Sequence, residues 1–253
     1  MLFYKLLFFA SALCVDNVPN YFLEMSTSRG RGQEIQRQLS SALVTFCATF
    51  KYLRLREGDD EGVLSEPASE QRPTYPSISL TLMFSKLAQG NAARLEDTLR
   101  SESSSWRTCH SPDAVRAQNE QLFALKNHAG PLLGLKSGCP LPGVRISVTF
   151  AQKLEEMEKF YQVITGVRPA PREDHKTGTS YRIYPIARNF ELQLVYNSAV
   201  QTDKVQNLRI CLRIANHQEI TAELHQPLTF IDADHWETND PVGNRVMLFN
   251  VLD

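Results

Sequence analysis

The chain has 253 residues, of which 42% are hydrophobic and 22% charged, and its formal net charge is −1. This is the composition of an ordinary globular protein, and the length suits one large domain or two of roughly 120 residues. A near-neutral charge gives no electrostatic argument for a nucleic-acid partner or an anionic membrane surface. We therefore predict no nucleic-acid partner.

Residues 1–17 form an apolar N-terminal segment that begins MLFYKLLFFASALC. A short apolar run after one lysine, with small residues near position 14, resembles a signal peptide, and a misplaced gene-model start gives the same pattern. The run is too short to span a bilayer, so we predict no membrane span. The expected location is the cytoplasm or nucleus, with secretion as the alternative if residues 1–14 are a signal peptide.

The cysteines are scattered, which argues against a zinc finger or a thioredoxin-like motif, because no two form a CxxC pair. We interpret them as reduced thiols. A secreted protein with structural disulfides is the other reading, and it rests on the N-terminal segment alone. The five cysteines stand at positions 14, 47, 109, 139 and 211.

Residues 18–129 are predicted to form an α+β domain with the order β-α-β-β-α-β-β, its helices packed on one face of a sheet. The acidic stretch 57–76 is poor in large apolar residues and is predicted to be a mobile loop. Strands are predicted at 21–27, 52–56, 77–84, 106–110 and 121–125, and helices at 32–50 and 90–101.

A connector is predicted at residues 130–142, GPLLGLKSGCPLP, because Gly and Pro concentrate there. We place the domain boundary in this segment. The second domain, 143–253, has a more regular pattern: the strand 144–150 alternates strictly, and the helix 153–165 stops at Gly166. Further elements are strands at 180–187, 190–197, 208–214, 230–236 and 245–251, and a helix capped by Asn216 that runs through 224.

The turn 240–244, DPVGN, runs directly into the last strand and resembles the closing hairpin of the glyoxalase-like (vicinal oxygen chelate) superfamily. The segment EKFYQVITG resembles the first-helix signature of the same superfamily. The longer pattern W-x-T-x-D-x-x-G-N is similar to the animal group called family with sequence similarity 124. The resemblance implies two β-α-β-β-β modules in residues 144–253 that together make a curved sheet around a cup.

Enzymes of the superfamily bind a divalent metal with His and Glu ligands, one from the first and one from the last strand of each module. The first-strand position matches Ile146 or Arg145 here, and the second module offers Arg209. The last strands offer Glu191 or Gln193 and, after DPVGN, Met247 in place of the expected Glu. At least three of the four positions therefore lack a metal ligand, and we predict neither a metal nor another cofactor.

The simplest reading of the missing ligands is an inert cup whose arginine side chains reach solvent at the rim. Two functional hypotheses stand beside it. In the first, Arg145 and Arg209, with Arg213, line a metal-free cup and bind an anionic ligand or an acidic peptide, because guanidinium groups hold carboxylate or phosphate in a bidentate manner. This predicts a non-catalytic binding or scaffold protein, and a monomer is compatible with it. In the second, a metal-dependent lyase or dioxygenase has a rearranged site in which Glu191 acts with His235 or with the pair Asp232 and Asp234.

Overall fold

The computed structural model describes residues 20–43, 52–58, 75–102, 104–109, 120–126, 130–224 and 226–250. The apolar segment 1–17 lies outside these residues. So do the greater part of the loop predicted at 57–76 and the end of the helix predicted at 32–50. Within the described residues, no helix has both the length and the apolar character that crossing a bilayer requires.

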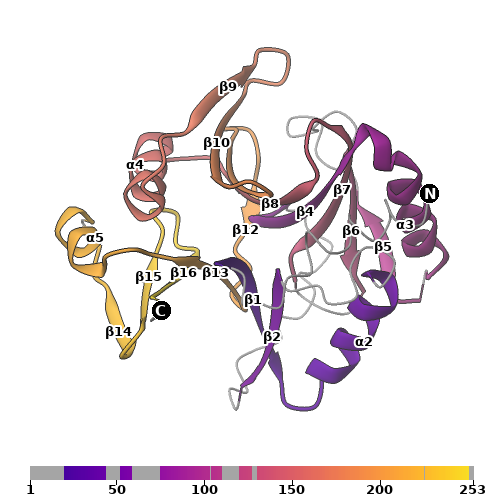
Figure 1. Cartoon of the computed structure of the whole chain (residues 1–253), viewed down its shortest axis with the longest axis horizontal. Coiled ribbons are helices and arrows are strands. Elements are labelled where there is room, and N and C mark those ends of the chain that lie inside the picture. The colour runs from indigo at the N-terminus through magenta and orange to yellow at the C-terminus, as the bar shows by residue number, and fades with distance from the viewer. Residues whose placement is uncertain are drawn as a thin grey trace.

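Two mixed sheets carry the fold (Figure 1). The six-stranded sheet has the order β14 (Thr229–Asp232), β15 (His235–Asn239), β16 (Arg245–Phe249), β13 (Leu208–Arg213), β1 (Tyr21–Ser28), β2 (Leu53–Gly58). The eight-stranded sheet has the order β5 (Trp106–Cys109), β6 (Glu120–Leu125), β7 (Leu132–Cys139), β4 (Ile78–Ser85), β8 (Gly143–Phe150), β11 (Phe190–Tyr196), β10 (Thr179–Ala187), β9 (Ala170–Asp174).

The β-α-β-β-β order occurs three times in the described chain, and each time the first strand pairs in parallel with the last. The repeats start at β4, β8 and β13, and their helices are α3 (Gln89–Ser101), α4 (Leu154–Thr165) and α5 (His217–Glu223). The α+β class expected from the sequence is confirmed. The strands β1 and β2, joined by α2 (Gly32–Leu43), also pair in parallel.

The two C-terminal repeats do not lie side by side, as the sequence suggests they would. Instead, β8 pairs antiparallel with β4, and β13 pairs antiparallel with β1. Each sheet therefore combines strands from both sides of the predicted domain boundary. The physical reason is that one edge of each repeat's first strand presents unpaired backbone N–H and C=O groups. A strand distant in the chain pairs with them.

The segment 130–142 contains strand β7, not a connector. Its glycine Gly134 is required by close packing: a Cβ atom there would lie 2.5 Å from Thr81 Oγ1 and 2.7 Å from Glu120 Oε1. Glycine within a strand commonly marks such a close approach. At the end of the segment predicted as a loop, Tyr75 and Pro76 form β3, which pairs with β12 (Thr202–Asp203).

The helices cover one face of each sheet. Helices that connect strands of different sheets contact each other, α4 with α5 and α2 with α3. In Figure 1, α4 and α5 lie together on one side of the molecule, and α2 and α3 lie on the other. Alternate strand residues, such as Val144, Ile146 and Val148 of β8, are fully buried toward the helices. The large core under the helices takes side chains from both sheets. We call the opposite surface of each sheet, turned away from the helices, its distal face.

Candidate functional site

The distal face of the eight-stranded sheet brings Arg145, Glu191 and Gln193 together. Arg145 on β8 lies directly opposite Glu191 on β11, and the two side chains form an ion pair. One step along the same strands, Ser147 Oγ donates a hydrogen bond to Gln193 Oε1 at 3.2 Å. Arg145 is only 7% exposed, so its guanidinium is already neutralised inside the protein by Glu191.

The same row of side chains continues onto the neighbouring strands. Thr81 on β4 lies opposite Arg145, and its hydroxyl donates a 2.6 Å hydrogen bond to Glu120 on β6. Burial lowers the pKa of Lys136 on β7, and the nearby Arg145 lowers it further. Both carboxylates of this row, Glu120 and Glu191, thus have a partner in the protein.

The distal face of the six-stranded sheet carries a chain of charged side chains across four strands. Arg209 on β13 pairs with Glu24 on β1 at 2.8 Å, and its other terminal nitrogen lies 3.8 Å from Glu237 on β15. Arg245 on β16 donates to Glu237 at 2.6 Å. Arg209 is 7% exposed, so a buried guanidinium stands between two carboxylates, as a metal cation would.

Met247, the residue that the resemblance puts in place of the last metal ligand, has a carboxylate, Glu237 on β15, directly opposite it. On its other side, Met247 meets apolar groups. It lies opposite Cys211 on β13, which lies opposite Phe22 on β1. These three residues and Phe249 form a separate buried apolar cluster. Burial raises the pKa of the Cys211 thiol well above its usual range, which keeps it protonated and a poor ligand.

The sequence-predicted residues therefore divide between two sites. Arg145, Glu191 and Gln193 belong to one sheet, whereas Arg209, Arg213 and Met247 belong to the other. Arg213 lies at the end of β13 and donates to Asn20 Oδ1 at 3.3 Å. The expectation that Arg145 and Arg209 line one cup is corrected by this topology, because their strands pair with different partners.

Three residues of the alternative site, Asp232, Asp234 and His235, lie at the turn between β14 and β15. His235 Nδ1 is 2.6 Å from Asp232 Oδ1, and that oxygen also accepts the backbone N–H of Asp234. The contact with His235 holds the pKa of Asp232 below its usual value. Glu191 lies in the other sheet and does not join them. Across the described ranges, no group of three or more His, Cys, Asp or Glu side chains is arranged to hold a metal ion.

The DPVGN turn joins the two sheets. Asp240 Oδ1 accepts the backbone N–H groups of Val242 and Asn244, and its Oδ2 accepts the Asn244 side chain and the Tyr161 hydroxyl of α4. On the other side, Ser77 Oγ, just before β4, bonds to Asn244 Oδ1 at 3.0 Å. Asp240 is only 2% exposed, and burial raises its pKa. The turn is thus a structural joint.

A divalent metal does not fit the residues present on either distal face. The row through Met247 offers one carboxylate, Glu237, which is held by Arg245 and lies near Arg209. Its other members are a thioether, a protonated thiol and a phenyl ring, none of which is a ligand for a hard cation. On the other sheet, Glu191 is held by Arg145, and Glu120 accepts from Thr81.

Sequence reasoning did not find Glu24 and Glu237. The signal that was available for Glu24 is a single charge within the apolar strand YFLEM.

Comparison with solved structures places the fold in a known class. A glyoxalase I variant from Zea mays has a TM-score of 0.61 at 12% identity, over 91% of this chain and 94% of that one. Glyoxalase I from Zea mays gives 0.53 at 15% identity, over 78% and 73%. A putative dioxygenase from Bacillus subtilis subsp. subtilis str. 168 gives 0.54 at 10% identity, over 90% and 84%.

These similarities define a protein with the glyoxalase-like, vicinal oxygen chelate fold; at such identities they show the fold alone. The family model of the FAM124 domain matches residues 21–249, so the chain belongs to the FAM124 family. Comparison with the curated proteins gives no match.

Proposed function

We propose that this protein is a metal-independent, non-catalytic binding protein, and that the distal face of its six-stranded sheet binds an anionic ligand or an acidic peptide. The main support is an unpaired hydrogen-bond donor on Arg209. Its side chain is buried, yet its Nε–H has no acceptor among the described residues. A buried donor without a partner costs about 1–3 kcal/mol, which an oxygen of a bound carboxylate or phosphate would recover.

The charges around Arg209 support the same conclusion. Strand alternation and register put Glu24 and Glu237 on this face, where they are outnumbered by arginines. Arg54 stacks over the Phe22 ring at 4.2 Å, which leaves the edge of its guanidinium to donate. The arginines of this face are Arg54, Arg56, Arg209, Arg213 and Arg245. The register also puts Asp232 on this face, where it contacts His235. The excess of the five arginines over the three carboxylates favours an anionic partner.

The alternative function, a metal-dependent enzyme with a rearranged site, has less support. Its residues lie in different sheets: Glu191 is paired with Arg145, whereas His235 and Asp232 contact each other on an exposed turn. All three of these groups are therefore engaged, and Glu191 lies in the other sheet.

Titration calorimetry with inorganic phosphate, citrate and an oligoglutamate peptide tests the proposal. At least one probe is expected to bind the wild type, roughly tenfold more weakly to Arg209→Met, and several-fold more weakly to Arg245→Met. Arg94→Met changes an exposed arginine on α3 and is the matched control. Equal affinity in Arg209→Met, Arg245→Met and Arg94→Met, or no binding of any probe to the wild type, contradicts the proposal.

A further inference from the structure

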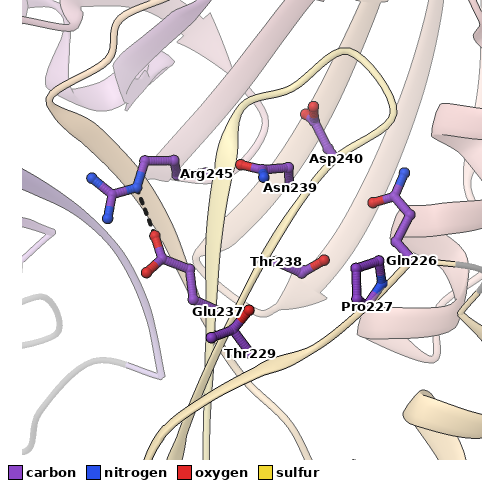
Figure 2. A pocket seen from close by; sticks show the side chains of 8 residues that line it. All are labelled: Gln226, Pro227, Thr229, Glu237, Thr238, Asn239, Asp240 and Arg245. Atoms are coloured by element: carbon purple, nitrogen blue, oxygen red, sulfur yellow. Dashed lines mark hydrogen bonds and ion pairs between the residues drawn. The ribbon is translucent and has the colours of Figure 1, made fainter.

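A pocket of about 520 Å³ lies beside β15, a volume within the usual range for small-molecule sites. It adjoins the charged chain of the six-stranded sheet: Glu237 and Arg245 of that chain line the pocket, whereas Glu24 and Arg209 do not. Figure 2 shows the side chains that line it. They are Gln226, Pro227, Thr229, Glu237, Thr238, Asn239, Asp240 and Arg245.

Pro227 explains why the pocket exists. The ladder between β14 and β15 begins at the pair Thr229–Glu237, and the preceding Pro227 has no N–H with which to extend it. The chain therefore separates from β15, and the edge of that strand opens. Because neighbouring strand residues project to opposite faces, the pocket passes round this edge, with Glu237 on one side and Thr238 on the other (Figure 2).

Two buried polar atoms of the lining lack a partner among the described residues. Thr238 is 5% exposed, and its Oγ1 makes no hydrogen bond; Gln226 Oε1 makes none either. In Figure 2 both oxygens point into the space between β15 and the segment 226–229. Buried polar atoms are almost always hydrogen-bonded, so these two indicate a missing hydrogen-bonding group. Asp240 differs, because both of its oxygens have partners.

The chemistry of the lining selects the ligand. Thr238, Gln226 and Asn239 each both donate and accept hydrogen bonds, which matches hydroxyl groups. A cation would meet Arg245, and an anion would meet Glu237, whose own charge is satisfied by Arg245 at 2.6 Å. We propose that this pocket binds a small neutral polyhydroxylated molecule, of the sugar or polyol type, with its hydroxyls on Thr238 and Gln226 and its C–H surface on Pro227.

Ligand-observed NMR and calorimetry on the full chain test this site. The probes are glucose, ribose and myo-inositol, with glucosamine and glucuronate as charged counterparts. At least one neutral probe is expected to bind at millimolar concentration and more tightly than its charged counterparts. Thr238→Val is expected to weaken binding roughly tenfold, as is Gln226→Met. Thr98→Val, on the outer side of α3, is the matched control and is expected to bind as the wild type does.

The thermal stability of the free variant gives a second readout. Because the Thr238 hydroxyl has no partner, Thr238→Val is expected to have a Tm equal to or above that of the wild type, whereas a structural hydroxyl would give a lower Tm. Neutral probes carry no charge, so Arg209→Met is expected to leave their binding intact, which separates this site from the anion site. No binding of any neutral probe, or unchanged binding in both Thr238→Val and Gln226→Met, overturns the proposal.

Discussion

Arg145 and Arg209 each put a guanidinium at a position where the superfamily resemblance implies a metal ligand. Each stands on the first strand of a β-α-β-β-β repeat, is 7% exposed, and pairs with a glutamate on an adjacent strand, Glu191 or Glu24. A guanidinium is an obligate cation that cannot leave, exchange or bind water as a metal does. A carboxylate held this way is not free to ligate a metal or to act as a base.

The ion pair of Arg209 and Glu24 is expected to stabilise the fold as a unit. Removing one member leaves a buried charge without its partner, so Glu24→Gln and Arg209→Met are each expected to lower the free energy of unfolding by about 3 kcal/mol. The double variant Glu24→Gln/Arg209→Met is expected to lose much less than the sum. Urea denaturation of all four proteins measures this coupling. Additive losses show that the pair does not act as a unit.

The stabilisation by Tyr161 is expected to depend on pH. Burial, and next the charge of Asp240, raise the pKa of Tyr161 well above its usual value. A raised pKa means that the stabilisation is complete below the ordinary phenol pKa of about 10 and is lost as pH rises above it, because only the unfolded chain then ionises. Tyr161→Phe is expected to lose about 1 kcal/mol at pH 7 and to show a smaller alkaline decline than the wild type in urea denaturation. An equal alkaline loss of unfolding free energy in the wild type and in Tyr161→Phe contradicts this expectation.

At the scale of elements, the 240–244 turn joins β15 and β16 to α4 and to the start of β4. Asp240→Ala removes four hydrogen bonds from a 2%-exposed carboxylate and is expected to cost about 3 kcal/mol or more. The matched control is Asp232→Ala, an aspartate that also caps a turn but is exposed. Its expected cost is below about 1 kcal/mol in the same denaturation assay. An equal loss of unfolding free energy in Asp240→Ala and Asp232→Ala contradicts the structural role of the turn.

Local sequence patterns predicted some elements correctly and missed others. Alternation in residues 144–150 predicted a strand, which is confirmed as β8, and Gly166, with a φ of 66°, ends α4 as expected. The strand β7 was missed because Gly134 and Gly138 suggest a turn. Gly134 is small because Thr81 and Glu120 approach it, and both lie far away in the sequence. A single sequence does not contain that contact.

The candidate site was predictable only in part, for the same reason. The family resemblance pointed to Arg209 on the predicted strand 208–214, and the DPVGN turn pointed to Met247. Neither signal indicates that β1 lies beside β13, so neither could identify Glu24 as the partner of Arg209. Charges that meet across a sheet depend on strand order, which local patterns do not encode.

At the scale of the whole molecule, the two sheets share strands from both halves of the chain. A fragment of residues 143–253 would lose β4 from the edge of β8 and β1 from the edge of β13. We therefore expect this fragment to lack cooperative thermal unfolding and dispersed amide resonances. The full chain treated in the same way is the control. A fragment that unfolds cooperatively and gives a dispersed spectrum shows that the half is an independent domain.

Metal binding is the decisive property, because we infer that buried guanidinium groups and an apolar row occupy the positions of the metal ligands. The measurement is equilibrium dialysis of the reduced full chain against zinc, manganese, nickel and iron(II), followed by elemental analysis. The expected result is far less than one equivalent of each metal. One equivalent bound in the wild type, and lost on Glu24→Gln or Glu191→Gln, would contradict the account.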